Sequence, residues 1–338
     1  MHVDYLILGQ GLAGTLLSRE LLSRGHSVYV TGRELRQSAG MHSSAVIQPL
    51  AGRKLHLRPQ IEAEQSCARS VYQDFEAILQ TDLLHEQSLL RFYTDAAEQE
   101  LYEQALRNGT PFLNGTDSTD AEAASVFESP IFGMAKIAPV YRIDASLLLE
   151  SWQNYLKERG VFSEANTADK LQINAGKPVV MEGLTADKLV YCEGSSGRAN
   201  LLFPDTIMNR NRGEYLELHI PGLNERYLYQ GALRLVPKGN HLWWCGSNYT
   251  WEYADMQPDA GWRQAALQSL QHWLKIPFTL IGHNVAERPT TAGQRPLLLQ
   301  HEVYRHCYFF NGLGTRGYSA GPLLARQMAD MLTQLPNP

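Results

Sequence analysis

The sequence has few cysteines, and they form no pattern that would bind a metal ion or build a disulfide framework. Its four cysteines are widely scattered, without a CxxC pair: Cys67, Cys192, Cys245 and Cys307. Metal sites and disulfide-rich domains both need characteristic cysteine spacings. We therefore expect buried free thiols in a reducing compartment, and no metal ion.

The chain also lacks long apolar runs and an excess of positive charge. No stretch approaches the roughly 18–20 consecutive apolar residues of a membrane helix. The segment Met1 to Tyr5 shows neither the basic region nor the cleavage site of a secretory signal. The formal net charge of −5 weighs against a nucleic-acid partner, because phosphate binding depends on Lys and Arg. These absences predict a cytoplasmic protein without a membrane or nucleic-acid partner.

The composition is that of an ordinary globular protein. The chain has 338 residues, of which 44% are hydrophobic and 19% charged. That length can bury a large core and exceeds one domain of usual size. We see no internal repeat and no low-complexity segment, so two closely joined domains are expected.

The first thirty residues predict a βαβ unit. An apolar run of strand length, Val3 to Leu8, leads into the segment Gly9 to Gly14, which reads Gly-Gln-Gly-Leu-Ala-Gly. Apolar residues at helical spacing follow, from Leu12 to Arg24, and Ser27 to Thr31 forms the second predicted strand. A GxGxxG turn in this context indicates a dinucleotide-binding Rossmann unit.

Each glycine of this turn has a physical role in that interpretation. Gly9 permits the tight turn, Gly11 lets a pyrophosphate approach the backbone, and Gly14 lets the helix pack closely on the sheet. Leu12 and Ala13 begin the helix, whose N-terminus offers N–H groups and a positive dipole end to the phosphates.

One position departs from this fingerprint. An acidic residue that binds the adenosine ribose is expected about 20 residues past the turn, and Gly32 stands there. Arg33 and Glu34 follow it. Either Glu34 substitutes from a shifted loop, or the backbone and water hold the ribose.

The remaining pattern predicts a domain inserted into another. Helices are expected at 62–79, 96–106, 145–159, 259–274 and 318–332, and strands at 89–93, 188–192, 215–220, 228–236 and 241–246. A mononucleotide-type unit at each end encloses strand-rich material. We predict a cofactor domain from residues 1–85, 135–210 and 285–338, and a substrate domain from residues 86–134 and 211–284.

The segment Asn311 to Pro322, which reads Asn-Gly-Leu-Gly-Thr-Arg-Gly-Tyr-Ser-Ala-Gly-Pro, carries a family resemblance. Together with the opening turn it resembles the D-amino-acid oxidase superfamily, and is most similar to glycine oxidase-like proteins and to the oxidase half of the bifunctional tRNA-uridine modification enzyme. Four further stretches match in the order that the family shows: 43–49, 189–194, 243–249 and 287–291.

The resemblance implies an α/β fold with an FAD-binding Rossmann-type domain, similar to glutathione reductase, and an inserted, mostly antiparallel sheet with helices. It implies an extended FAD whose isoalloxazine ring lies at the domain junction, with the substrate above it. Gly312, Gly314 and Gly317 would let the backbone pass close to the ring, and the helix from Tyr318 would stabilise negative charge on reduced flavin. Gly194 and Thr315 are further expected cofactor contacts.

The resemblance also suggests catalytic residues. Arg288 occupies the position where an arginine binds the carboxylate of an amino-acid substrate, a task that suits a planar guanidinium; the alternative is an ion pair with Glu287 or another acid. Arg316 is the second candidate, for substrate or flavin. Tyr249 is a candidate pocket residue, although aromatic residues are more often packing.

The stretch His42-Ser43-Ser44 would pass near the flavin. His42 lies about where some related dehydrogenases carry a histidine bonded to FAD, and the alternative is a hydrogen-bonded histidine beside the cofactor. No cysteine lies close to Arg288, where sarcosine oxidase-like relatives attach the flavin. We therefore expect non-covalent FAD.

Three functional hypotheses follow. The first is oxidation of a C–N bond in a small amine or amino acid: hydride transfer to flavin N5, hydrolysis of the imine, and reoxidation by dioxygen to give hydrogen peroxide. The second is an oxidase of a larger modified nucleotide, against which the acidic net charge weighs. The third is a flavin-binding module that serves a protein partner. Substrate identity and oligomeric state are not encoded in recognisable motifs.

Overall fold

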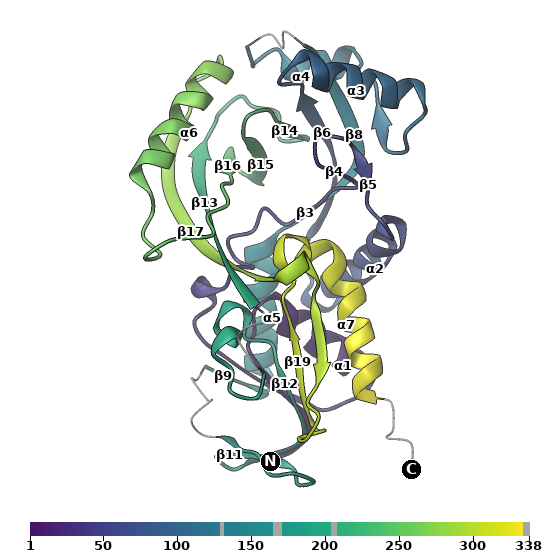
Figure 1. Ribbon diagram of the computed structural model, residues 1–338, viewed down its shortest axis with the longest axis vertical. Helices are drawn as coiled ribbons and strands as arrows, with labels where there is room; N and C mark the ends of the chain where they lie inside the picture. Colours follow the sequence, from purple (N-terminus) through teal and green to yellow (C-terminus); the bar gives the residue numbers. More distant parts are fainter. Residues whose placement is uncertain (129–131, 165–170, 204–207, 334–338) are drawn as a thin grey trace.

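The computed structural model describes residues 1–128, 132–164, 171–203 and 208–333. Two large β-sheets, each with its own helices, lie one above the other along the long axis of the molecule (Figure 1). The lower unit in that view contains the N-terminal strand, and the upper unit contains the helices α3, α4 and α6.

The lower sheet is parallel around the N-terminal strand β1 (His2–Leu8). Strand β2 (Val28–Gly32) and strand β12 (Leu184–Tyr191) flank β1. The parallel sheet continues with β9 (Phe162–Glu164) beside β2 and β19 (Cys307–Asn311) beside β12. Antiparallel strands complete it: β10 (Leu171–Gln172), β11 (Val179–Met181) and β18 (Leu297–Gln300).

Both faces of β1 are buried, which explains its unbroken apolar sequence. Ile7 belongs to a hydrophobic cluster with residues of four helices, while Leu6 and Leu8 belong to a cluster with β12 and β19 on the opposite face. The four helices are α1 (Leu12–Ser23), α2 (Ile61–Leu79), α5 (Ala145–Glu158) and α7 (Gly317–Thr333). This core places the carboxyl ends of β1, β12 and β19 side by side.

The upper sheet is almost entirely antiparallel, with only β14 and β6 parallel to each other. Along it the order is β17 (Thr279–Thr291), β13 (Met208–His219), β16 (Leu242–Gly246), β15 (Arg234–Gly239), β14 (Tyr227–Gln230), β6 (Leu84–Phe92), β8 (Met134–Ile143) and β3 (Val46–Ile47), and β7 (Leu113–Asn114) pairs with β8. Helices α3 (Ala96–Arg107), α4 (Ser118–Ala124) and α6 (Ala260–Trp273) belong to this unit, and β4 (Leu50–Ala51) with β5 (His56–Leu57) forms a small hairpin.

The α/β class predicted from the sequence is confirmed, while individual elements differ from expectation. The apolar run 228–236, expected as one strand, is interrupted after Gln230: Gly231 N–H donates to Leu233 C=O, and the chain turns from β14 into β15. The long strand β17 was not predicted. Strand β8, which the expected limits assign to the cofactor domain, pairs within the upper sheet; the domain limits themselves stay a proposal.

Among the described residues no helix is long and apolar enough to cross a membrane. In the same part of the chain no group of three or more His, Cys, Asp or Glu residues could hold a metal ion. The four cysteines are buried and free.

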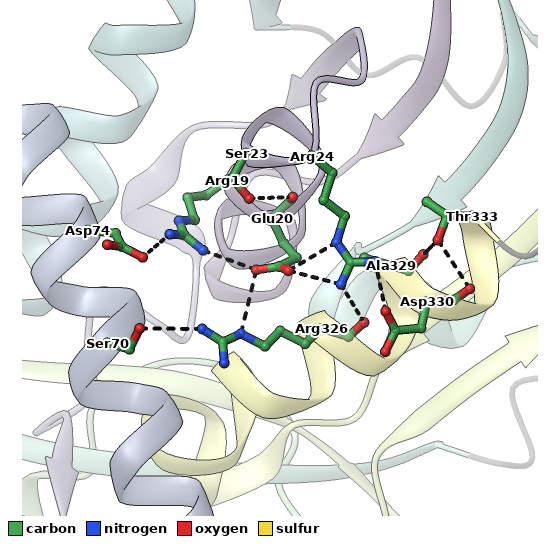
Figure 2. A network of polar contacts seen from close by, with 10 residues as sticks. All are labelled: Arg19, Glu20, Ser23, Arg24, Ser70, Asp74, Arg326, Ala329, Asp330 and Thr333. Atoms are coloured by element: carbon green, nitrogen blue, oxygen red, sulfur yellow. Dashed lines mark hydrogen bonds and ion pairs between the residues drawn. The ribbon is translucent and has the colours of Figure 1, made fainter.

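A buried carboxylate joins three helices of the lower unit (Figure 2). Glu20 of α1 accepts hydrogen bonds from Arg19 Nη1 at 3.0 Å and from Arg24 Nε at 3.1 Å, and Arg326 of α7 lies at ion-pair distance. Arg19 also binds Asp74 of α2. Since only 9% of the Glu20 side chain is exposed, its loss would remove a largely buried carboxylate that three guanidinium groups share.

We expect Glu20→Gln to lower the free energy of unfolding by about 2 kcal/mol, because it breaks a largely buried ion-pair network. Thermal unfolding of the cofactor-loaded protein would show a fall of a few degrees in the midpoint. The matched control is Glu100→Gln on α3, an exposed glutamate. Equal midpoints for the two variants would contradict this account.

Candidate functional site

One large cavity lies where the two units meet, and both glycine turns line it. Its volume is about 810 Å³, and Gly9, Gly11 and the segments 12–13 and 313–319 belong to its wall. The turn 9–14 follows β1 and the turn 312–317 follows β19, so residues from opposite ends of the chain share one cleft. The helices α1 and α7 both begin there.

The glycines of these turns allow close contacts. A Cβ atom on Gly9, whose φ is +104°, would lie 2.3 Å from the carbonyl oxygen of Cys192. One on Gly14 would lie 1.8 Å from the carbonyl oxygen of Gly9. The turn can therefore form against β12 only with glycine at both positions.

Two of the C-terminal glycines leave room for neighbouring protein groups, whereas we expected from the sequence that they let the backbone pass close to the flavin. A Cβ atom on Gly312 would lie 2.6 Å from Thr291 Cγ2, and one on Gly317 would lie 2.8 Å from Leu12 Cδ2. Gly312 and Gly14 are not part of the cavity wall, whereas Gly314, Thr315, Gly317 and Tyr318 are. Gly317 thus lets the N-termini of α1 and α7 pack together.

The N-terminus of α1 fits a diphosphate. No side chain caps this helix at Gly11, and its first turn carries no acidic residue, so its N–H groups are left to an anion. A Cβ atom on Gly11 would meet only Ser38 Oγ, at 3.3 Å, and would otherwise project into the space that a pyrophosphate needs. The cradle therefore suits the group that the sequence predicts.

The end of β2 is tight for the usual acidic side chain. A Cβ atom on Gly32 would lie 3.1 Å from Gln10 Cβ, and Gln10 is fixed by Thr15 and the Leu149 carbonyl. Arg33 and Glu34 do line the cavity.

Glu193 is a cavity residue that sequence reasoning missed. It lies two residues past the end of β12, lines the same cavity as Gly194, and accepts a hydrogen bond from Asn200 Nδ2 at 3.1 Å. Burial raises the pKa of Glu193, while Asn200 and the charge of Arg33 oppose the shift. An acidic residue just past a parallel strand next to β1 was the signal available in the sequence.

His42 lies in the cavity wall beside Ser43 and Ser44, and both of its ring nitrogens are engaged. Nε2 lies 2.8 Å from the Arg36 carbonyl oxygen and Nδ1 lies 3.1 Å from the Tyr215 hydroxyl. Because a carbonyl can only accept, Nε2 carries the proton and Nδ1 accepts from Tyr215.

Arg288 projects from β17 into the cavity wall and is held by neutral groups. Its Nη1 donates to Asn211 Oδ1 at 2.6 Å, and its Nη2 donates to Ser247 Oγ at 2.9 Å and to the Asn248 carbonyl at 3.2 Å. The guanidinium carbon lies 4.4 Å from the centre of the Tyr249 ring. Burial lowers the pKa of Arg288. The group stays charged, because arginine does not lose its proton in proteins.

The alternative ion pair of Arg288 with Glu287 does not form. Glu287 Oε2 instead accepts from Arg210 Nε at 3.1 Å and from the Tyr253 hydroxyl. No carboxylate in the described part of the chain pairs with Arg288. The guanidinium is thus a cation in a cavity wall, stabilised by dipoles and one aromatic ring.

Sequence reasoning also missed what places Arg288. Gly213 lies on β13, and a Cβ atom there would be 2.0 Å from Arg288 Nη2, so the guanidinium passes over a glycine. Glu214, fully buried, accepts from Asn248 Nδ2 at 3.1 Å, and thereby fixes the residue whose carbonyl binds Arg288. The pattern Arg-Gly-Glu in a strand gave no such indication.

The other two candidate residues lie at the same cavity. Tyr249 lines it with 58% of its surface exposed, and its ring covers Arg288. Arg316 also lines it and is exposed. All three side chains proposed for catalysis from the sequence thus line the same cavity.

This architecture defines a class: an α/β dinucleotide-binding oxidoreductase with a second sheet over the cofactor cleft. The whole chain matches one family, described as FAD dependent oxidoreductase (DAO), over residues 4–331. The protein therefore belongs to the DAO family of FAD-dependent oxidoreductases, and FAD is its cofactor.

Solved structures with the same fold include three with different named activities. Iminodiacetate oxidase from Chelativorans sp. BNC1 has a TM-score of 0.81 and 17% identity, covering 98% of this chain and 96% of its own. Glycine oxidase from Bacillus cereus has 0.80 and 16%, covering 98% and 94%. L-Amino acid deaminase from Proteus vulgaris, with an insertion deleted, has 0.75 and 15%, covering 98% and 90%.

Gly11→Ala tests the cofactor cradle. The variant should fold, because only the Ser38 hydroxyl must move, yet its FAD affinity should fall at least about tenfold, since the methyl group occupies pyrophosphate space. Titration of the apoprotein with FAD, followed by flavin fluorescence, measures this, with the thermal midpoint as a check on folding. Gly115→Ala, at a glycine with no neighbour within 4 Å, is the control. Unchanged affinity in Gly11→Ala would rule out this placement of the diphosphate.

Proposed function

We propose that this protein oxidises a C–N bond of a small amine that carries a carboxylate, with non-covalently held FAD as the hydride acceptor. The observation that carries the proposal is Arg288, a cation in the cavity wall without a carboxylate partner among the described residues. Glycine oxidase, iminodiacetate oxidase and L-amino acid deaminase, which share the fold, are named for substrates of this class.

Arg288 is the group that binds the substrate carboxylate. A guanidinium has five N–H donors, and Asn211, Ser247 and Asn248 accept three hydrogen bonds from Arg288. The remaining donors can bind a carboxylate, and the three fixed bonds prevent the side chain from turning away. Preorganisation of this kind lowers the entropic cost of orienting the substrate.

The chain supplies positioning and electrostatics. FAD, when bound, accepts the hydride from the substrate carbon and passes electrons on. Tyr249 covers the bound carboxylate and its arginine, and Arg316 adds positive charge at the cavity mouth. The N-terminus of α7 faces the cavity at Gly317, where its dipole favours negative charge. Dioxygen, reduced to hydrogen peroxide, is the acceptor we propose, and the imine product is released to hydrolysis.

Non-covalent attachment is consistent with the surroundings of His42. Both ring nitrogens have hydrogen-bond partners within the protein, so neither is left to form a bond with the flavin. The histidine instead links the loop 42–44 to Tyr215 of the upper sheet.

The first test uses the purified protein. It should be yellow, release FAD on denaturation, and lose its visible absorbance when a substrate amine is added anaerobically.

Arg288→Gln should raise KM for a carboxylate-bearing amine by about 100-fold, because charge-assisted hydrogen bonds are lost, while FAD stays bound. Arg53→Gln, at a cavity arginine paired with Asp95, is the control. Peroxide formation on reoxidation distinguishes an oxidase from a dehydrogenase. An unchanged KM in Arg288→Gln would contradict the assignment.

Gly213→Ala tests the same site without removing a charge. Its methyl group would occupy the position of the guanidinium, so Arg288 must move. We expect carboxylate inhibitors, titrated against the flavin absorbance spectrum, to bind at least about tenfold more weakly, since hydrogen-bond geometry is lost. Retained FAD content shows that the cofactor cleft is intact. Inhibitor affinity as in the Gly115→Ala control would show that this close approach is unimportant.

A further inference from the structure

A second arginine lies in the same cavity wall without a carboxylate partner. Arg234 begins β15, where its Cα is paired with Gly246 of β16. The next residue, Ser247, accepts a hydrogen bond from Arg288. Both arginines line one cavity, Arg288 from β17 and Arg234 from β15, and β13 and β16 lie between those two strands.

The partners of Arg234 are neutral amides. Its Nη2 donates to Gln48 Oε1 at 2.8 Å and to Gln230 Oε1 at 2.9 Å. Burial and the nearby charge of Arg91 lower the pKa of Arg234 to about 10, although Tyr249 opposes the shift. The group stays a cation at neutral pH, in surroundings that stabilise charge less well than water does.

Three other arginines of the cavity wall are paired with carboxylates. Arg58 binds Glu64, Arg91 binds Glu98 and the more exposed Arg53 binds Asp95. In the described part of the chain, Arg234 and Arg288 have no such partner and are held by neutral groups.

Two acidic residues of the cavity wall already have partners. Glu214 accepts from Arg212 Nη2 at 2.9 Å and from His283 Nε2 at 2.9 Å, and Glu287 is bound by Arg210. Moving either carboxylate to Arg288 would break its own ion pair.

Tyr249 links the two cations. Its ring lies 4.4 Å from the guanidinium carbon of Arg288, and its phenol is close enough to influence the pKa of both Arg234 and Arg288. An anionic group at each arginine would compensate an enclosed positive charge.

We propose that Arg234 is a second anion-binding position, and that the substrate is an amine with two carboxylate groups, one bound by Arg288 and the other by Arg234. The inference rests on the proposed function, whose carboxylate position it keeps. It adds the second carboxylate, which sets the substrate class apart from glycine, alanine and other monocarboxylic amines.

Inhibitor binding tests the proposal without turnover. The FAD-loaded protein is titrated with malonate, succinate and glutarate, and with acetate, propionate and butyrate, and binding is followed by the flavin absorbance spectrum. The best dicarboxylate should bind at least about tenfold more tightly than the monocarboxylates, which corresponds to one charge-assisted hydrogen-bonded contact. The chain length that binds best reports the spacing of the two positions.

Variants separate the two positions from each other and from a structural role. Arg234→Gln should remove the preference for dicarboxylates and leave monocarboxylate affinity within about threefold, since only one contact is lost. Arg288→Gln should weaken both classes. Arg234→Lys, which keeps the charge but not the forked contact to both glutamines, should retain part of the preference. Arg53→Gln should behave like the unmodified protein.

The outcomes distinguish this inference from the proposed function. Equal affinity for both inhibitor classes in the unmodified protein would overturn the second position and leave Arg288 as the carboxylate site. An equal loss for both classes in Arg234→Gln and Arg234→Lys, with a lowered thermal midpoint, would assign Arg234 to structure and overturn it as well. Turnover supplies an independent readout: iminodiacetate, D-aspartate or D-glutamate should exceed glycine, sarcosine and D-alanine in kcat/KM.

Discussion

The contact of Gly9 and Gly14 at the end of β1 is the constraint on which the cofactor site depends. The carbonyl of Gly9 fills the space where any other residue at position 14 would place its Cβ, so α1 starts directly against the strand. The uncapped N–H groups of α1 are thereby aimed over the carboxyl end of a parallel sheet, where ligands of such folds bind. Gly317 repeats the arrangement, because its missing side chain admits Leu12 and brings α7 beside α1.

The distribution of charge in the upper sheet follows a different principle. Two carboxylates there form ion pairs within the protein: Glu214 with Arg212 and His283, and Glu287 with Arg210. The site is left with guanidinium groups held by amides, hydroxyls and carbonyls. Such an arrangement lowers the stability of the free protein. An anion bound there would restore the lost stability, as expected for residues whose role is to bind a ligand.

How far the sequence predicts this structure depends on how local each signal is. The βαβ unit and its glycines were predictable because strand, turn and helix are adjacent, and the boundaries of α1 and α7 differ from expectation by one residue. The upper sheet was predicted less well: the turn at Gly231 splits an apolar run, and β17 is recognised only through its partner β13. Contacts such as Gly213 with Arg288 join residues 75 positions apart, and no local pattern encodes them. The tight contact at Gly32 likewise arises from Gln10, which no spacing rule anticipates.

Strand β17 carries both Arg288 and a contact with the C-terminal glycine turn. Arg288 pairs with Asn211 of β13, and only three residues further Thr291 contacts the position of a Gly312 side chain. At about 3.3 Å per residue, the Cα atom of Arg288 lies roughly 10 Å along the strand from that of Thr291. Since β13 and β17 pair along their length, a hydrogen-bonded ribbon and not a flexible loop connects the two positions. The proposed substrate arginine and the contact with the glycine turn are therefore fixed to one strand, as hydride transfer between two bound molecules would require.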